Sequence, residues 1–282
     1  GKVNRAGAGR MDAMPAVSDA HLLAIARDLA VDAGALALRR RHEGVTVAAT
    51  KSSPVDVVTE TDREGEAFIR SRLAELRPDD AFVGEESDAS DGASGLTWVV
   101  DPIDGTVNFL YGIPAWSASI AVVEGGGDPP TWPATAGCVV NPVLGEVYSA
   151  ARGAGAFLGD ERLAVSGADD LALSLVGTGF AYAAETRRIQ ARIVTELVGR
   201  TRDVRRMGSA ALDLCAVAAG RLDAYYERGL NPWDQAAGAL IAAEAGARVS
   251  GLSGAPATRD FMLAATPQIA EALEAALVAA GV

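Results

Sequence analysis

The stretch Trp98-Val-Val-Asp-Pro-Ile-Asp-Gly-Thr-Val-Asn-Phe109 decides how the rest of this chain is interpreted. Its apolar start predicts a strand that ends at Asp101, because Pro102 has no N–H to donate to a sheet ladder. Gly105 then permits a sharp change of direction. The sequence therefore predicts a strand followed by a tight turn that carries two carboxylates, Asp101 and Asp104.

Two carboxylates held close together on rigid backbone repel each other unless a cation lies between them. At an effective dielectric constant of about 20 and a separation of about 4 Å, the repulsion costs roughly 4 kcal/mol. Hard cations such as Mg²⁺ prefer oxygen ligands, so the turn indicates one or more bound metal ions. The alternative at this stage is an ordinary turn whose two acidic side chains are solvated.

The composition is that of a folded globular protein with an acidic surface. Hydrophobic residues make up 49% of the 282 residues and charged residues 22%, which suits one large domain or two smaller ones. The net charge of −12 disfavours nucleic acid and membrane surfaces as direct partners. It also disfavours an anionic substrate unless metal ions supply positive charge locally.

Two further features bear on the compartment. We find no apolar run long enough to span a membrane and no signal-peptide pattern, so we expect a cytoplasmic protein. Cys138 and Cys215 lie far apart in apolar surroundings, and we expect both to be buried free thiols rather than a disulfide.

The chain divides into a short tail and two halves of different pattern. Residues 1–17 are aperiodic and rich in Gly and Ala, which predicts a disordered tail or a segment added for expression. Residues 18–165 read as two helices followed by several antiparallel strands, an α+β half with most of the candidate metal ligands. Residues 166–282 alternate helices and strands, as in a layered α/β unit that completes the substrate site.

Local signals place the first two helices. The first should begin after Ser18 or Asp19 and end at Gly44. Thr61 and Glu64 have the spacing of a capping box, which predicts the start of the second helix there.

Acidic residues stand beside predicted turns or helix starts at four places. They are Asp62 at a helix start, Glu85 at a strand end, the pair Asp101 and Asp104, and Asp234 after Asn-Pro-Trp. Taken alone, Asp234 favours a helix N-cap over a metal ligand.

Gly105 and Thr106 are suited to hold a phosphate group. A glycine lets the backbone approach an anion closely, and two successive N–H groups at a helix start form an anion nest. The Thr106 hydroxyl can hold a water molecule. Acidic residues with cations beside such a nest describe metal-assisted hydrolysis of a phosphate ester.

Six motifs stand in a characteristic order: Lys51-Ser-Ser-Pro-Val-Asp56, Gly84-Glu85-Glu86-Ser87, Asp101-Pro-Ile-Asp-Gly-Thr106, Gly208-Ser-Ala210, Asp223-Ala-Tyr-Tyr-Glu227 and Trp233-Asp-Gln-Ala-Ala-Gly238. Together they resemble the inositol monophosphatase family from about residue 20 to the C-terminus, and the bacterial SuhB-like inositol-1-monophosphatases in particular. The resemblance implies an α/β fold, the five-layer αβαβα sandwich of the inositol monophosphatase and fructose-1,6-bisphosphatase type. It also implies a homodimer.

The resemblance further implies two or three Mg²⁺ ions per active site, with competitive displacement of Mg²⁺ by Li⁺. Asp101 would contact two ions, and Glu85 would also contact a weaker third. The metal ligands implied are Glu85, Asp101, the carbonyl of Ile103, Asp104 and Asp234.

Catalysis in the family uses water as the nucleophile. The resemblance implies that water polarised by metal, Glu85 and Thr106 attacks phosphorus in line, with no phospho-enzyme. Asp62 and Thr106 would order the water around the third ion, and Lys51 would lie on a mobile loop over the site.

The substrate implied is a small phosphorylated polyol. The Gly105 and Thr106 N–H groups would hold the phosphate. The polyol hydroxyls would contact Asp104, Ala210, Glu227 and Asp234.

Three alternatives remain open on the sequence. Relatives with the same metal core act on histidinol phosphate, fructose-1,6-bisphosphate, NADP or phosphoadenosine phosphate, although Glu227 before Trp233-Asp234 favours a polyol such as inositol. A haloacid-dehalogenase-type phosphatase would use a nucleophilic Asp, but the spacing of Asp101 and Asp104 is one residue too long. An added role is protein contact with the transcription machinery in antitermination.

Overall fold

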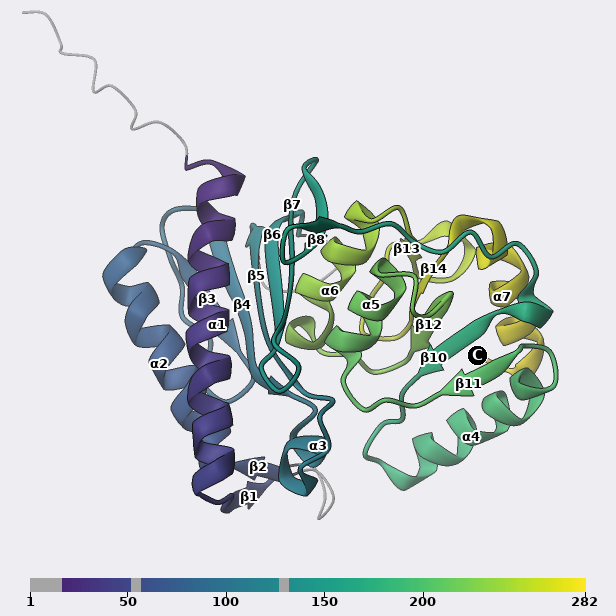
Figure 1. Ribbon diagram of the computed structural model, residues 1–282, viewed down its shortest axis with the longest axis horizontal. Helices are drawn as coiled ribbons and strands as arrows, with labels where there is room; N and C mark the ends of the chain where they lie inside the picture. Colours follow the sequence, from purple (N-terminus) through teal and green to yellow (C-terminus); the bar gives the residue numbers. More distant parts are fainter. Residues whose placement is uncertain (1–16, 52–56, 127–131) are drawn as a thin grey trace, which may run out of the picture.

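The computed structural model describes residues 17–51, 57–126 and 132–282, and these form five layers (Figure 1). From left to right in Figure 1 the layers are a helix pair, a seven-stranded sheet, a second helix pair, a five-stranded sheet and a third helix pair. The predicted αβαβα sandwich is therefore confirmed. The tail predicted for residues 1–17 lies outside the described residues, apart from Val17.

The first layer consists of α1 (Asp19–Glu43) and α2 (Glu60–Leu76). As predicted, α1 has Ser18 as its N-cap, which accepts a hydrogen bond from the His21 N–H, and it ends at Gly44. One face of α1 packs with α2 on the seven-stranded sheet, in a core that contains Leu22, Leu29 and Ile69.

The predicted capping box at Thr61 and Glu64 is wrong by two residues. Thr59 is the N-cap of α2, and its hydroxyl accepts the Asp62 N–H at 3.3 Å while Asp62 accepts the Thr59 N–H at 2.8 Å. Thr59 and Asp62 have the same three-residue spacing as Thr61 and Glu64, so spacing alone does not choose between the two registers. Glu64 instead accepts two hydrogen bonds from Arg40 of α1, at 2.7 and 2.8 Å.

The seven strands of the first sheet are paired in sequence order. The first pair is parallel and the others are antiparallel, so the expectation of antiparallel strands holds except at β3 and β4. The strands are β3 (Ala81–Gly84), β4 (Leu96–Asp104), β5 (Ser117–Glu124), β6 (Ala134–Asn141), β7 (Glu146–Ala151), β8 (Gly155–Leu158) and β9 (Glu161–Arg162). A separate hairpin joins β1 (Val47–Thr50) and β2 (Val57–Thr59).

The five-stranded sheet has the order β11-β10-β12-β14-β13. Its strands are β10 (Leu175–Thr178), β11 (Asp203–Arg205), β12 (Ala224–Glu227), β13 (Arg248–Ser250) and β14 (Met262–Ala265). The helices are α4 (Ala184–Val198) and α7 (Pro267–Ala280) on the outer face, with α5 (Ala210–Ala218) and α6 (Pro232–Glu244) between the sheets. Short 3₁₀ turns cover Leu171–Leu173 and Leu252–Gly254. Strand β13 was not predicted from the sequence, because its three residues include a single apolar side chain, Val249.

The two sheets follow each other along the chain. The seven-stranded sheet ends at Arg162 and the five-stranded sheet begins at Leu175, while the division into halves at residue 165 stays a prediction. Cys138 and Cys215 are buried and unpaired, as predicted. Within the described residues, no helix combines the length and apolar character needed to cross a bilayer.

Strand β6 shows how the sheet separates two cores. Cys138 and Val140 pack toward α1, whereas Val139 packs toward α6 in the alternating pattern of a strand buried on both faces. Gly137 lies on the α6 side, where an added Cβ would be 3.0 Å from the Cα of Ala237. The absence of a side chain therefore sets how closely α6 approaches the sheet.

We expect Gly137→Ala to lower the free energy of unfolding by about 1–3 kcal/mol, because the new methyl group meets α6 backbone that cannot move locally. Urea unfolding measures the loss. The control is Gly199→Ala, where nothing lies within 4 Å of the added Cβ and the expected change is within about 0.5 kcal/mol. Equal stabilities of the two variants would contradict the close approach.

Candidate active site

The site is built on the turn where β4 passes into α3 (Thr106–Tyr111). The strand runs to Asp104 and does not end at Asp101 as predicted; its register against β5 shifts between these two residues, where Pro102 interrupts the ladder. Gly105 follows with φ of 96°, and an added Cβ there would lie 3.0 Å from the Gly208 carbonyl oxygen. Only glycine fits this turn, which places Gly105 and Thr106 in the wall of the cavity.

Three of the predicted metal ligands come together. Carboxylate oxygens of Asp101, Asp104 and Asp234 all lie within 4.8 Å of one another. Asp101 and Asp104 are buried, with 1% and 7% of their surface exposed. Asp101 and Asp104 come from β4, and Asp234 comes from the first turn of α6, which packs on the same sheet.

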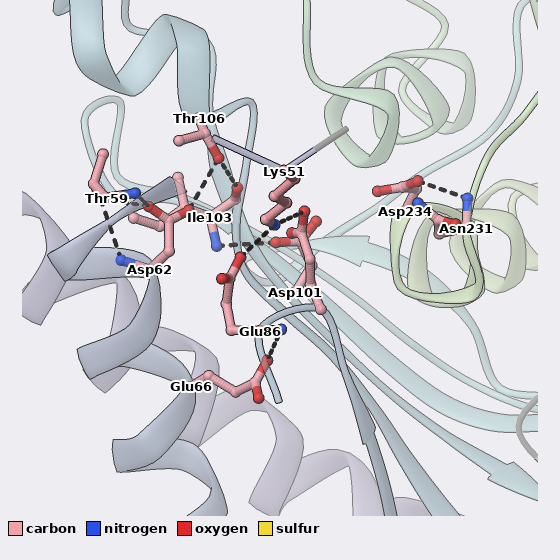
Figure 2. A network of polar contacts seen from close by, with 11 residues as sticks. Lys51, Thr59, Asp62, Glu66, Glu86, Asp101, Ile103, Thr106, Asn231 and Asp234 are labelled. Carbon is pink, nitrogen blue, oxygen red and sulfur yellow. Dashed lines mark hydrogen bonds and ion pairs between the residues drawn. The ribbon is translucent and has the colours of Figure 1, made fainter. Parts of the chain in front are cut away.

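Asp234 is not the N-cap of α6, which is the role favoured for it in isolation. Asn231 is the N-cap and Pro232 is the first helical residue. Asp234 accepts the Asn231 N–H at 2.7 Å through one carboxylate oxygen (Figure 2). The cap therefore orients the Asp234 side chain while leaving its other oxygen available to the cluster.

Glu85 adjoins this cluster at the end of β3. Its Oε1 atom lies 2.7 Å from Lys51 Nζ, which also lies 2.6 Å from Oε1 of Glu86. The burial of Glu85, offset in part by Lys51, raises the pKa of its carboxyl. Lys51 thus pairs with a predicted metal ligand, while its place on a mobile loop stays a prediction because the other residues of its motif, 52–56, lie outside the described residues.

The electrostatics of the cluster fit a bound cation. Burial and the charges of Glu85, Asp104 and Asp234 raise the pKa of Asp101 well above its usual range. Burial and the charges of Asp104 and Glu85 do the same to the pKa of Asp234. Oxygen ligands that are buried, convergent and mutually repelling form the donor set that a hard divalent cation prefers, and its charge would offset their repulsion.

Thr106 and Asp62 form a connected pair beside the cluster. The Thr106 hydroxyl lies 2.9 Å from Asp62 Oδ1 and 3.2 Å from the Ile103 carbonyl oxygen, and it can donate to either (Figure 2). Burial raises the pKa of Asp62 to about 6. Asp62 is fully buried behind Thr106, whereas Ile103 and Thr106 line the cavity.

Asp104 is held by the start of α5. Its Oδ2 atom accepts hydrogen bonds from the Ser209 hydroxyl at 2.5 Å and the Ala211 N–H at 2.8 Å. Burial nevertheless raises the pKa of Asp104 to about 6. The N-terminus of α5 also places Ala210 in the cavity wall.

Glu227 forms the far wall of the cavity at the end of β12. Burial raises the pKa of its carboxyl to about 7, and the Tyr225 hydroxyl donates a hydrogen bond to it. Gly179 lies against Glu227, since an added Cβ would be 2.0 Å from the Oε2 atom. Position 179 therefore has no space for a side chain while Glu227 keeps this orientation.

A single cavity of about 210 Å³ joins these groups. Lys51 and Asp62 contact its lining residues Glu85 and Thr106, respectively. The predicted site residues that line it are Glu85, Asp101, Ile103, Asp104, Gly105, Thr106, Ala210, Glu227 and Asp234.

Two charged lining residues were missed by the sequence analysis. The positive charge of Arg206 faces Asp104 and Glu227, and its guanidinium lies 5.8 Å from the Phe180 ring centroid. Asp213 on α5 is 2% exposed, and its Oδ1 atom has no hydrogen-bond partner. Its position in the sequence could have identified Asp213 as a lining residue. Asp213 lies one helical turn after Ser209, on the face of α5 that contacts Asp104.

Comparison with known proteins agrees with this geometry. The inositol monophosphatase family matches residues 18–281. The curated inositol-1-monophosphatase SuhB of Mycobacterium tuberculosis (H37Rv) is 48% identical over 279 residues, covering 92% of this chain and 93% of that protein. A Pasteurella multocida protein named Nus factor SuhB is 42% identical over 226 residues, covering 78% of this chain and 82% of that protein.

Among solved structures, Mycobacterium tuberculosis SuhB superimposes with a TM-score of 0.78 at 47% identity, covering 94% of this chain and 98% of that one. The match spans both sheets and every described segment that contributes to the cavity. The chain therefore belongs to the inositol monophosphatase family of phosphomonoesterases.

Proposed function

We propose that the protein is a cytoplasmic, Mg²⁺-dependent phosphatase that hydrolyses inositol monophosphate to inositol and phosphate. The observation that carries the proposal is the convergence of Asp101, Asp104 and Asp234 in one cavity that Gly105 and Thr106 also line. The printed name of the Mycobacterium tuberculosis relative supports the substrate, and two unpaired cysteines favour the compartment.

We assign the metal ligands as Glu85, Asp101, Asp104, Asp234 and the carbonyl of Ile103, for two or three Mg²⁺ ions. The cluster is suited to this role because it is buried, made of oxygen donors and destabilised by its own charge. When bound, Mg²⁺ supplies positive charge that activates water and stabilises a departing alkoxide. The ions would also offset the charge of −12 that otherwise repels an anionic substrate.

The chain's own groups position the phosphate and the attacking water. The N–H groups of Gly105 and Thr106 bind phosphate oxygens at the start of α3. When the Thr106 hydroxyl donates to Asp62, its oxygen lone pairs are free to accept a hydrogen bond from water. Glu85 is the nearby base that takes the second interaction with this water and accepts its proton.

The opposite side of the cavity binds the alcohol. Asp104, Glu227 and Asp234 offer carboxylate oxygens to hydroxyl groups, and Ala210 leaves space at the start of α5. A ring with several hydroxyl groups can satisfy these acceptors together, which an unsubstituted alcohol cannot do. The arrangement therefore favours a polyol phosphate.

The substrate assignment is tested by phosphate release from inositol-1-phosphate, histidinol phosphate, fructose-1,6-bisphosphate and NADP. We expect inositol-1-phosphate to be hydrolysed fastest with Mg²⁺ and Li⁺ to inhibit by competing with Mg²⁺. Asp101→Asn should lose at least about 10³-fold in kcat, because it removes a charge shared by two metal positions. Histidinol phosphate faster than inositol-1-phosphate by about tenfold would refute the substrate and keep the reaction class.

We expect the stability of the metal-free protein to fall as pH rises from about 4 to about 7. Burial raises the pKa of Asp62 and Asp104 to about 6 and that of Glu227 to about 7. Unfolding restores values near their usual range of about 4, so the folded state binds more protons in this window and stability is lost on the order of a few kcal/mol.

Mg²⁺ should reverse this trend, because a cation favours the charged carboxylates. Urea unfolding at about pH 5 and about pH 7, with a chelator and with saturating Mg²⁺, measures the effect. The gain in unfolding free energy on adding Mg²⁺ should be larger at the higher pH. An equal gain at both pH values would contradict the assignment of these carboxylates to the metal environment.

We also propose that the protein is a homodimer. Several large apolar side chains are exposed: Tyr111 is 75% exposed, Ile113 47% and Tyr182 42%. Tyr111 and Tyr182 line one hollow next to the active-site cavity. An apolar surface of this kind favours association.

Light scattering at micromolar concentration should give twice the chain mass of 28.9 kDa. Tyr111→Ser should shift the protein toward the monomer, because it removes the most exposed of these side chains. A wild-type monomer would refute the homodimer.

A second role is favoured by one observation, the name Nus factor SuhB carried by the Pasteurella multocida relative. We propose it as an added contact with the transcription machinery through protein surfaces, since the charge of −12 disfavours direct RNA binding. Asp101→Asn separates the roles in cells. A transcription phenotype that persists without phosphatase activity would support the second role, and its loss together with activity would count against it.

A further inference from the structure

We propose that Glu66 is a positioning residue for the metal site, acting through the backbone that carries Glu85. Glu66 lies in α2, and its carboxylate contacts the segment directly after β3. The inference rests on the proposed function, because it concerns affinity for the same metal ions.

The contacts of Glu66 are made to the chain immediately after the ligand. Its Oε2 atom accepts the Glu86 N–H at 2.7 Å (Figure 2), and its Oε1 atom accepts the Ser87 hydroxyl. The Glu86 N–H belongs to the peptide group that joins Glu85 to Glu86. Holding this N–H fixes the orientation of that peptide group, and with it the direction in which the Glu85 side chain leaves the backbone.

The local sequence is shaped around this carboxylate. Glu66 is only 2% exposed, and a buried carboxylate is costly unless donors satisfy it. Gly84 provides the space: an added Cβ at this position would lie 2.4 Å from Glu66 Oε2 and 2.7 Å from Cε1 of Phe82. Strand β3 therefore ends in a glycine, directly before the predicted ligand, so that the helix carboxylate can reach the next two residues.

One face of α2 contacts three segments of the candidate site. Asp62 and Glu66 are one helical turn apart and point the same way. Asp62 accepts the Thr106 hydroxyl at the start of α3, and Gly65 between them lets the helix approach the Pro102 ring, whose Cβ would be 3.1 Å from an added Cβ. The helix thereby sets the spacing of parts of the site that come from separate strands.

This support opposes a repulsion within the site itself. Asp101 and Glu85 both line the cavity and Asp101 is buried, so their carboxylates repel each other when both are ionised. Repulsion between the two carboxylates favours movement of the β3 end away from the cluster when no cation is present. The Glu66 hydrogen bonds resist that movement. The metal ligands are therefore already in position, and less free energy is lost in ordering them when a cation binds.

The test measures Mn²⁺ binding to the whole protein by the loss of the free Mn²⁺ signal in electron paramagnetic resonance. Glu66→Ala should bind Mn²⁺ about 10- to 100-fold more weakly than the wild type. Glu66→Gln should retain affinity to within a few-fold, because its amide oxygen can accept the Glu86 N–H while its amide nitrogen donates to the Ser87 hydroxyl.

The matched control is Glu64→Gln, two residues earlier on the same helix. Glu64 is partly exposed and pairs with Arg40 away from the site, so its variant should bind Mn²⁺ as the wild type does. A second readout is phosphatase activity against Mg²⁺ concentration. Glu66→Ala should need more Mg²⁺ for half-maximal activity and recover near wild-type kcat at saturation, because the ligands remain present.

Unchanged Mn²⁺ affinity in folded Glu66→Ala would overturn the proposal, as would an equal loss in Glu66→Gln. If Glu66→Ala does not fold, Ser87→Ala removes one of the two contacts alone; a few-fold loss of affinity supports the proposal and no loss overturns it. A wild type that binds Mn²⁺ without hydrolysing inositol monophosphate would refute the proposed function and leave the role of Glu66 standing.

Discussion

The mutual repulsion of buried carboxylates is the constraint on which the rest of this structure depends. Asp101, Asp104 and Asp234 hold oxygens within 4.8 Å of one another, with Asp101 and Asp104 buried and Asp234 partly exposed, and Glu85 adds a fourth charge beside them. No hydrophobic gain favours such an arrangement. The arrangement is stable because each carboxylate belongs to a strand or helix that is held in place by hydrophobic packing away from the site.

Backbone N–H groups at helix starts, which have no partner within their own helix, donate hydrogen bonds to two of these carboxylates. The first turn of α5 donates to Asp104, and the cap of α6 donates to Asp234. Lys51 supplies positive charge, since its ammonium group pairs with both Glu85 and Glu86. Two glycines allow close packing around the site. Gly137 lets α6 lie close to the seven-stranded sheet, and Gly84 leaves space at the end of β3 for the Glu66 carboxylate.

Local chemistry made the central turn readable from the sequence. A proline that cannot pair, a glycine and two acids three residues apart predicted a turn here. The turn is present at Gly105, which has a positive φ, although the strand runs on to Asp104. The exact first residue of a helix was harder to predict, because more than one nearby pair of residues satisfies the spacing of a helix cap. The α2 capping box falls at Thr59 instead of Thr61, and the N-cap of α6 is Asn231 and not Asp234.

By itself, the sequence determined the layered fold, the turn at Asp101 and, through its ordered motifs, the family. The tertiary structure alone decided which distant groups surround that turn: Glu66 holds the Glu86 N–H, Arg206 faces Asp104, and Asp213 lies in the cavity wall with its Oδ1 atom unpaired. The physical reason is that turns and caps are local, determined by backbone sterics within a few residues. Contacts between helices and strands depend on how closely their surfaces pack. That distance cannot be predicted from the spacing of residues along the chain.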